Sequence, residues 1–307
     1  MGEKYIPPEA MGITENNLNN PQNMTNEIDK DHEEAIKENI SRAKDRIWNE
    51  QQTEGIVAKL QNQEAEKFFS PENFTDRESL FVESKEKLCC IDEGVFNIED
   101  ESHKMALAGS GILFPANSRK ERLDRVAEIC KKRGIKHITS HEGCGAASMA
   151  WEAGKKNGEK EALEAKSANE YGKNWSEDLT STINQAITKE ENKVEHKYVD
   201  KSEMIRPPEF HDARTVWFDA TSTFHPDAAK QLPKGFLIDY GLAQNEGKNE
   251  TEKEYPFAEL EVAIGIAFGG HGFGDKFTAE NPFIIVVVEE KNESKLENIK
   301  KDIEKFF

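Results

Sequence analysis

The pattern of apolar positions divides the chain into three regions. Residues 1 to 27 are rich in Asn, Pro and Glu and show little apolar periodicity, which is typical of a flexible arm. From residue 28 to residue 83, apolar residues such as Ile36, Ile40 and Ile47 recur at helical spacing between dense charges. This spacing predicts an amphipathic helical extension that packs on the main domain or on another subunit.

Beyond residue 84, short apolar runs alternate with helical patterns up to residue 307. Strands are expected at 88–91, 111–114, 135–140, 214–220, 235–240 and 283–288. Helices are expected after Ser118, from Ala146 to about Lys156, across most of the charged span 156–195, near 256–268 and after Ser294. Apolar strands separated by helices favour an α/β fold with a mostly parallel central sheet covered by helices.

The net charge and the lack of long apolar runs limit the binding partners and the cellular compartment that we expect for this chain. The chain of 307 residues carries a net charge of -18, which disfavours binding to nucleic acid and to anionic membrane surfaces. No apolar run approaches the roughly 20 residues that span a bilayer, and the first residues lack a basic region followed by an apolar one. We therefore expect a soluble cytoplasmic protein without membrane or nucleic-acid partners.

The four cysteines, Cys89, Cys90, Cys130 and Cys144, are too few for a disulfide scaffold in a chain of this size. Cys89 alternates with Cys90 along a predicted strand and should point into the core. Cys130 follows an apolar position at helical spacing and has the same interpretation. Cys90 and Cys144 are thereby left as candidates for chemistry.

Two polar segments each follow a predicted strand. Cys-Cys-Ile-Asp-Glu-Gly occupies 89–94, and Ser-His-Glu-Gly-Cys-Gly occupies 140–145. Sites in open α/β sheets form at the carboxyl ends of strands, so Cys90, His141 and Cys144 are expected to meet there. Two thiolates and one imidazole suit Zn²⁺, and three protein ligands leave a fourth position for water, as in catalytic zinc sites.

Asp92 lies two residues beyond Cys90 and should project from the same side of an extended chain, within reach of a water on the metal. Gly143 and Gly145 would let the backbone approach the ion closely. A single His-x-x-Cys is more often an ordinary loop, because buried cysteines behave as small apolar residues and histidines as hydrogen-bonding ones. The pairing with Cys-x-Asp is what favours a metal site.

These residues resemble the motifs of a known family. Cys90-Ile91-Asp92 and the segment from His141 to Gly145 are similar to the C-x-D-x-R and H-x-x-C-G motifs of β-class carbonic anhydrases, and the 51-residue separation of Cys90 and His141 is also typical. The segment 108–113, Ala-Gly-Ser-Gly-Ile-Leu, and the order of the later strands resemble the related cadmium-type, or ζ-class, enzymes. The resemblance covers roughly residues 86 to 290.

The resemblance implies that Cys90, His141 and Cys144 bind zinc or cadmium. Asp92 would then accept a hydrogen bond from metal-bound hydroxide as it attacks carbon dioxide. The chain departs from the motif at Gly94, where the family has an arginine that keeps the aspartate off the metal. Asp92 would then be free to become a fourth ligand, unless another base such as Arg119 or Arg214 takes the place of that arginine.

Two functions follow from this pattern. The first is a zinc lyase that hydrates carbon dioxide, or a related small electrophile, to a product such as bicarbonate. The alternative is a catalytically silent, carbonic-anhydrase-like protein whose metal has a structural, sensing or interaction role. Pairing of subunits into a homo-oligomer through the helical extension is compatible with either function.

Further polar residues have more than one interpretation. His211, Asp212 and His225 flank the strand 214–220 and could shuttle protons or bind a second metal, although strand-flanking polar residues more often lie on a hydrated surface. The glycine-rich run around His271 could border a substrate, but such runs are more often flexible loops.

Overall fold

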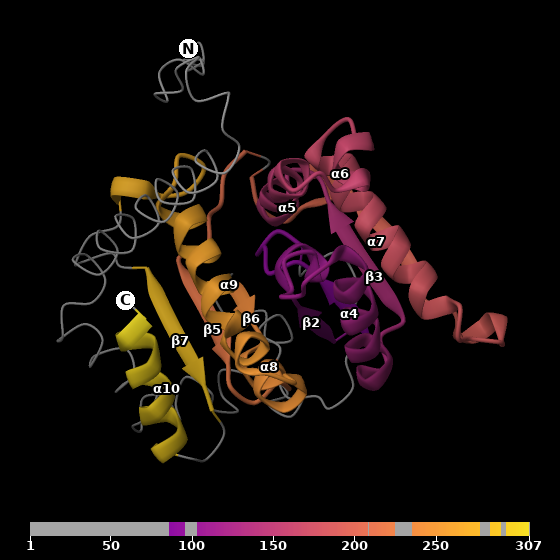
Figure 1. The fold of residues 1–307 in the computed structure, drawn as a ribbon. Coiled ribbons are helices and arrows are strands. Elements are labelled where there is room, and N and C mark those ends of the chain that lie inside the picture. The colour runs from indigo at the N-terminus through magenta and orange to yellow at the C-terminus, as the bar shows by residue number, and fades with distance from the viewer. Residues whose placement is uncertain are drawn as a thin grey trace, which may run out of the picture.

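The structure is a computed structural model that describes residues 86–95, 103–207, 209–224, 235–276, 283–289 and 293–306. The expected flexible arm at 1–27 and the helical extension at 28–83 lie outside these residues. Within the described residues, helices alternate with parallel strands, which confirms the predicted α/β class (Figure 1).

The strands form two parallel sheets in place of the single central sheet that the sequence predicts. The first sheet has the order β2 (Lys104–Ala106), β1 (Lys87–Cys89), β3 (His137–His141) and β4 (Glu195–Val199). The second has the order β6 (Phe236–Ile238), β5 (Thr215–Asp219) and β7 (Ile284–Val288). The sheets adjoin, because the Leu237 N–H donates to the carbonyl of Ile91 at 3.3 Å and the Ala106 N–H donates to Asp239 Oδ2 at 2.9 Å.

Helices follow most of the strands. They are α4 (Arg119–Arg133), α5 (Gly145–Lys156), α6 (Lys160–Glu164), α7 (Ala168–Asn184), α8 (Tyr240–Glu246), α9 (Glu250–Phe268) and α10 (Glu293–Phe306). Helix α4 begins where its sequence predicts, since Ser118 Oγ accepts a hydrogen bond from the Glu121 N–H at 3.2 Å. It ends at Gly134, whose φ of 72° is the left-handed conformation typical of a helix end.

The core lies between the sheets and these helices. All five residues of β5 are buried, and Trp175 and Trp217 are among the largest fully buried side chains. Cys89 and Cys130 are fully buried, which confirms their interpretation as core residues. Among the described helices, none combines the length and the apolar character needed to cross a membrane.

Several of the described elements, including α8, differ from the sequence prediction. Residues 111–114 are not a strand: the 3-10 helix η4 (Ala108–Gly111) and a turn occupy this segment, and Gly109, Ser110 and Gly111 all have positive φ, which a strand excludes. Strands β2 and β4 were not predicted. Strand β4, Glu-His-Lys-Tyr-Val, is a sheet edge with mostly exposed or half-buried residues, so it lacks the apolar run of a central strand.

Candidate metal centre

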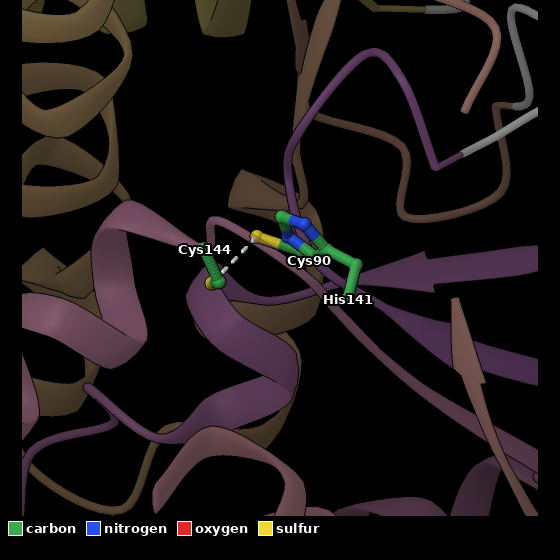
Figure 2. Close-up of side chains that lie close together, drawn as sticks. All are labelled: Cys90, His141 and Cys144. Atoms are coloured by element: carbon green, nitrogen blue, oxygen red, sulfur yellow. Dashed lines mark hydrogen bonds between the residues drawn. The ribbon is translucent and has the colours of Figure 1, made fainter. Parts of the chain in front are cut away.

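Cys90, His141 and Cys144 converge at the carboxyl end of the first sheet. Cys90 directly follows β1, His141 is the last residue of β3, and Cys144 is the N-cap of α5. Strands β1 and β3 are parallel neighbours, so their carboxyl ends lie at one edge. The sulfur and nitrogen ligand atoms all lie within 4.8 Å of one another, and all three residues are buried (Figure 2). The predicted constellation is therefore present in the fold.

The turn between β3 and α5 depends on Gly143. This residue has a φ of 69°, in the left-handed region that favours glycine, and an added Cβ would lie 3.2 Å from Lys201 Cε. Gly145 is under no such constraint, because an added Cβ there would be in ordinary contact, 3.8 Å from Ile266 Cδ1. Gly143 thus sets the geometry that puts two candidate ligands on one turn.

The ring of His141 presents a nitrogen that suits a metal ion. Its Nδ1 lies 3.1 Å from the carbonyl oxygen of Glu142, which can only accept, so Nδ1 carries a hydrogen and Nε2 is the nitrogen that can bind a metal ion once it has lost its own proton. Nε2 is buried and has no hydrogen-bond partner among the described residues; Asp92 Oδ2 is 4.0 Å away. A buried polar atom without a partner is costly, and a cation bound at Nε2 would satisfy it.

The two thiols share a proton when no cation is bound. Their sulfur atoms are 3.9 Å apart, and the Gly109 N–H donates to Cys90 Sγ at 3.2 Å. Contact with Cys90 lowers the pKa of Cys144; burial opposes this, and the N–H groups of Ala147 and Ala146 at the start of α5 lower it further. The same contact, together with burial, raises the pKa of Cys90 well above its usual value. Cys144 is therefore the readier thiolate.

Protons compete with a cation for this site. Burial alone would lower the pKa of His141, but the neighbouring Cys90 and Asp92 raise it to about 9. Because metal ligands must be deprotonated, occupancy by a divalent ion requires proton release from His141 and from Cys90, and binding weakens as the pH falls.

Asp92 is held beside the three ligands by Arg206. Its Oδ1 accepts hydrogen bonds from Arg206 Nε at 2.9 Å and from the Gly94 N–H at 2.7 Å, and its Oδ2 accepts from Arg206 Nη2 at 3.0 Å. Burial would raise the pKa of Asp92, but His141 and then Arg206 hold it well below its usual range. Asp92 therefore remains ionised, with both oxygens fixed by a bidentate ion pair.

Arg206 occupies the space that opens at Gly94. A Cβ added to Gly94 would lie 2.6 Å from Arg206 Cγ. The two bases named from the sequence lie elsewhere: Arg119 pairs with Asp178 at 2.6 Å, and the Arg214 guanidinium stacks 4.1 Å from the ring centroid of Phe273. A base from elsewhere in the fold does pair with Asp92, but it is Arg206 and not Arg119 or Arg214.

Sequence reasoning missed Arg206 because this residue belongs to a loop 114 positions beyond Asp92. No periodicity or motif surrounds it in the segment Met-Ile-Arg-Pro-Pro. The only trace in the sequence is the glycine at position 94, which leaves room for a side chain from another segment.

A cavity of about 990 Å³ adjoins the metal centre. Its wall includes Gly143 and Gly145 from the turn before α5, together with Arg206 and His211. The glycine-rich run around His271 also contributes to the wall, so this loop does border a cavity. The volume is at the upper end of the range usual for small-molecule pockets.

One wall of the cavity carries a carboxyl group that favours its protonated form. Glu259 is only 1% exposed, and its Oε1 accepts a hydrogen bond from the Ala108 N–H at 2.6 Å. Burial raises the pKa of Glu259 to about 8; the Ala108 N–H opposes this rise, and Asp239 adds to it. Nothing in the sequence set Glu259 apart from the other acidic residues of its helix.

His211 is buried, whereas polar residues that flank a strand more often lie on a hydrated surface. It is 9% exposed, and its Nδ1 lies 3.0 and 3.1 Å from the two carboxylate oxygens of Glu93. Ligand atoms of Asp92, Glu93 and His211 lie within 4.8 Å of one another, but the guanidinium of Arg206 already pairs with Asp92 and disfavours a second cation there. His225 lies outside the described residues.

No protein-family model, curated protein or solved structure matches this chain.

Proposed function

We propose that the chain binds zinc through Cys90, His141 and Cys144 and hydrates carbon dioxide to bicarbonate, the activity that its resemblance to β- and ζ-class carbonic anhydrases implies. One observation carries the proposal: three buried donors converge within 4.8 Å, and one of them, His141 Nε2, has no other partner among the described residues. Cadmium, a softer ion, would suit the same donors.

Bound zinc would act as a Lewis acid that lowers the pKa of a water molecule toward neutrality. Asp92 would supply the hydrogen-bond acceptor beside that water. Oδ2 accepts a hydrogen bond from Arg206 Nη2 and lies 4.0 Å from His141 Nε2, so it retains capacity to accept another hydrogen bond on the metal side.

Arg206 supports the proposal by restraining Asp92. Its two hydrogen bonds hold the carboxylate in one orientation, and breaking them would leave two buried charges unpaired. A carboxylate held in this way acts as an acceptor and does not compete for the metal. This is the role that the resemblance gives to the arginine missing at position 94.

The test is metal analysis together with stopped-flow hydration of carbon dioxide by the full chain and by Cys144→Ser. The proposal expects one zinc per chain and measurable hydration, with both lost in Cys144→Ser. The matched control is Cys130→Ser, which changes another buried thiol but leaves the three ligands intact. Unchanged metal content in Cys144→Ser would show that the ligand assignment is wrong.

A metal site without turnover is the second candidate. The observation that favours it is the burial of the ligands, of which Cys90, His141 and Cys144 are 4%, 3% and 6% exposed. Burial of this degree limits the access of solvent and substrate to a bound ion. Stoichiometric zinc, a large loss of stability on chelation and no hydration at any pH would favour this candidate over the lyase.

A further inference from the structure

The sulfur atoms of Cys90 and Cys144 face each other across a short gap (Figure 2). They are 3.9 Å apart, although the two residues are separated by 54 positions in the sequence, and both thiols are free. The sulfur–sulfur bond of a disulfide is about 2.05 Å long, so the two atoms must approach by about 1.9 Å to form one. This approach is small compared with the distance that a sulfur atom moves when its side chain changes rotamer.

The other two thiols of the chain are separate from this pair. Cys89 Sγ donates to the carbonyl of Met105 at 3.7 Å, and Cys130 lies fully buried in α4. Neither thiol belongs to the group of sulfur and nitrogen atoms that lie within 4.8 Å of one another. The fold therefore brings together one pair of cysteines and keeps the remaining two in the core.

Cys144 is the thiol of the pair that a small oxidant from the cavity meets first. Gly143 and Gly145, its two neighbours in sequence, both line the cavity, whereas Cys144 itself is only 6% exposed. This exposure favours an oxidant little larger than water, such as hydrogen peroxide. Cys144 is also the N-cap of α5, and a helix N-terminus stabilises the thiolate, which is the form of cysteine that reacts with peroxide.

Oxidation of this pair would remove ligands from the candidate metal centre. Zinc binds the thiolate form of cysteine, and a disulfide has no thiolate to offer. One sulfur–sulfur bond would therefore remove two of the three candidate ligands and leave the imidazole of His141 alone. Disulfide formation and metal binding thus exclude each other at this site.

We propose that Cys90 and Cys144 form a redox switch, in which hydrogen peroxide joins them in a disulfide and releases the bound metal. The Cys144 thiolate attacks peroxide, the O–O bond breaks, and the products are a sulfenic acid and hydroxide. The Cys90 thiol then attacks that sulfur, so that the disulfide bond forms and water leaves. Two electrons pass from the two sulfurs to peroxide. The disulfide rests on the geometry of the sulfurs, and the metal release rests on the zinc binding proposed above.

The first test treats the full chain as isolated with hydrogen peroxide, blocks the remaining thiols under denaturing conditions and locates the linked peptides by mass spectrometry. We expect a link between Cys90 and Cys144, with two of the four thiols left for blocking. Cys89→Ala removes the ambiguity of the adjacent thiol and should still form the link. Cys90→Ser lacks the second thiol, so the sulfenic acid of Cys144 should accumulate and be trapped by dimedone.

The second test follows the metal. A colorimetric chelator measures the zinc that leaves the zinc-loaded wild type during peroxide treatment, and one ion should leave for each disulfide formed. Dithiothreitol followed by added zinc should restore the original metal content, because a disulfide is reversible whereas the higher oxidation states of cysteine are not. Cys130→Ser is the matched control, since it removes a buried thiol outside the pair, and it should release zinc as the wild type does.

The outcomes separate the switch from the proposed function. A wild-type chain that is oxidised to sulfinic acid without a link, or that links Cys89 or Cys130, overturns the switch. Zinc that stays bound to a chain carrying the Cys90–Cys144 link overturns the metal release. A chain that binds no zinc before treatment overturns the proposed function, and the peptide link still decides whether the two sulfurs form a disulfide.

Discussion

In the proposed function, Asp92, Gly94 and Arg206 would decide whether the candidate metal centre keeps an open position. Asp92 is an ion-pair partner of Arg206, and the Gly94 N–H donates to the same carboxylate oxygen at 2.7 Å. In the proposed function, Gly94 and the distant Arg206 together would do what one arginine in a local motif would do. The contacts of Arg206 with Asp92 would then compensate for the departure of the sequence from the C-x-D-x-R pattern.

Variants that place the arginine at position 94 in place of position 206 test whether the two positions are equivalent. Arg206→Ala should leave zinc bound but reduce kcat/KM for hydration by about 10- to 100-fold, because Asp92 loses its restraint. Gly94→Arg alone should also be impaired, since its Cβ meets Arg206 Cγ at 2.6 Å. The double variant Gly94→Arg, Arg206→Ala should recover activity relative to both single variants in the stopped-flow assay.

Arg119→Ala is the control for this series, because it removes an arginine that pairs with Asp178 away from the centre. Additive losses in the double variant would contradict the idea that the two positions share one role. Gly94 does not have a positive φ, so the backbone there accepts a side chain.

The convergence of the three candidate ligands could be predicted from the sequence, but the ion pair that holds Asp92 beside them could not. Cys90, His141 and Cys144 lie next to predicted strand ends, and parallel strands bring such ends together without further information. Arg206 and His211 reach the site through loops, whose course depends on packing between the two sheets. No local pattern encodes that packing.

At the scale of elements, the site depends on the unit formed by β3, the turn at 142–144 and α5. The strand ends with His141, Gly143 turns the chain in the left-handed region, and Cys144 caps the helix. The N–H groups of the first turn of α5 face the Cys144 thiolate and stabilise it. This unit therefore fixes the positions of two candidate ligands, His141 and Cys144, and favours the thiolate form of Cys144.

The two glycines of this turn should respond differently to alanine. Gly143→Ala forces a side chain into a φ of 69° and should cost on the order of 1 to 2 kcal/mol of unfolding free energy, with weaker zinc binding. Gly145→Ala lies in the first turn of α5 and should be neutral or stabilising by about 0.5 kcal/mol. Urea unfolding measures the change in unfolding free energy, and competition with a chelator measures the change in zinc affinity. Equal effects of Gly143→Ala and Gly145→Ala on these two quantities would contradict this account of the turn.

The elements themselves were predictable where an apolar run or a cap marked them. Strands β3, β5 and β7 and the start of α4 at Ser118 agree with the sequence prediction. The expected strand at 111–114 failed because its apolar residues pack a turn with positive φ at Gly109, Ser110 and Gly111. Strand β4 was not predicted because it lies at the edge of its sheet, where a strand needs few apolar residues.

At the scale of the whole molecule, the junction of the two sheets buries acidic groups near the cavity. Asp239 follows β6 and accepts from the end of β2, and Glu259 on α9 accepts from the Ala108 N–H. Glu259 has a pKa of about 8 in the folded chain, against an ordinary value of 4.5 for a glutamate. Folding is favoured while this carboxyl is protonated.

Stability should therefore decrease as the pH rises across this window. The contribution of neutral Glu259 is fully present below pH 4.5 and is lost as the pH rises through about 8, because ionisation is easier in the unfolded chain. The Gln side chain of Glu259→Gln stays neutral at every pH. Between pH 5 and 8, the unfolding free energy of the wild type should therefore fall by roughly 3 kcal/mol more than that of Glu259→Gln. Glu250→Gln, an exposed change on the same helix, is the control and should keep the wild-type pH profile. Identical profiles for wild type and Glu259→Gln would contradict this assignment.

The central claim is that Cys90, His141 and Cys144 form one metal centre, and X-ray absorption at the zinc K-edge tests it most directly. The zinc-loaded chain should show two sulfur neighbours at about 2.3 Å and two lighter neighbours at about 2.0 to 2.1 Å, with one sulfur lost in any residual zinc of Cys144→Ser. A chain that binds no stoichiometric zinc, or whose zinc has no sulfur neighbours, would contradict the claim.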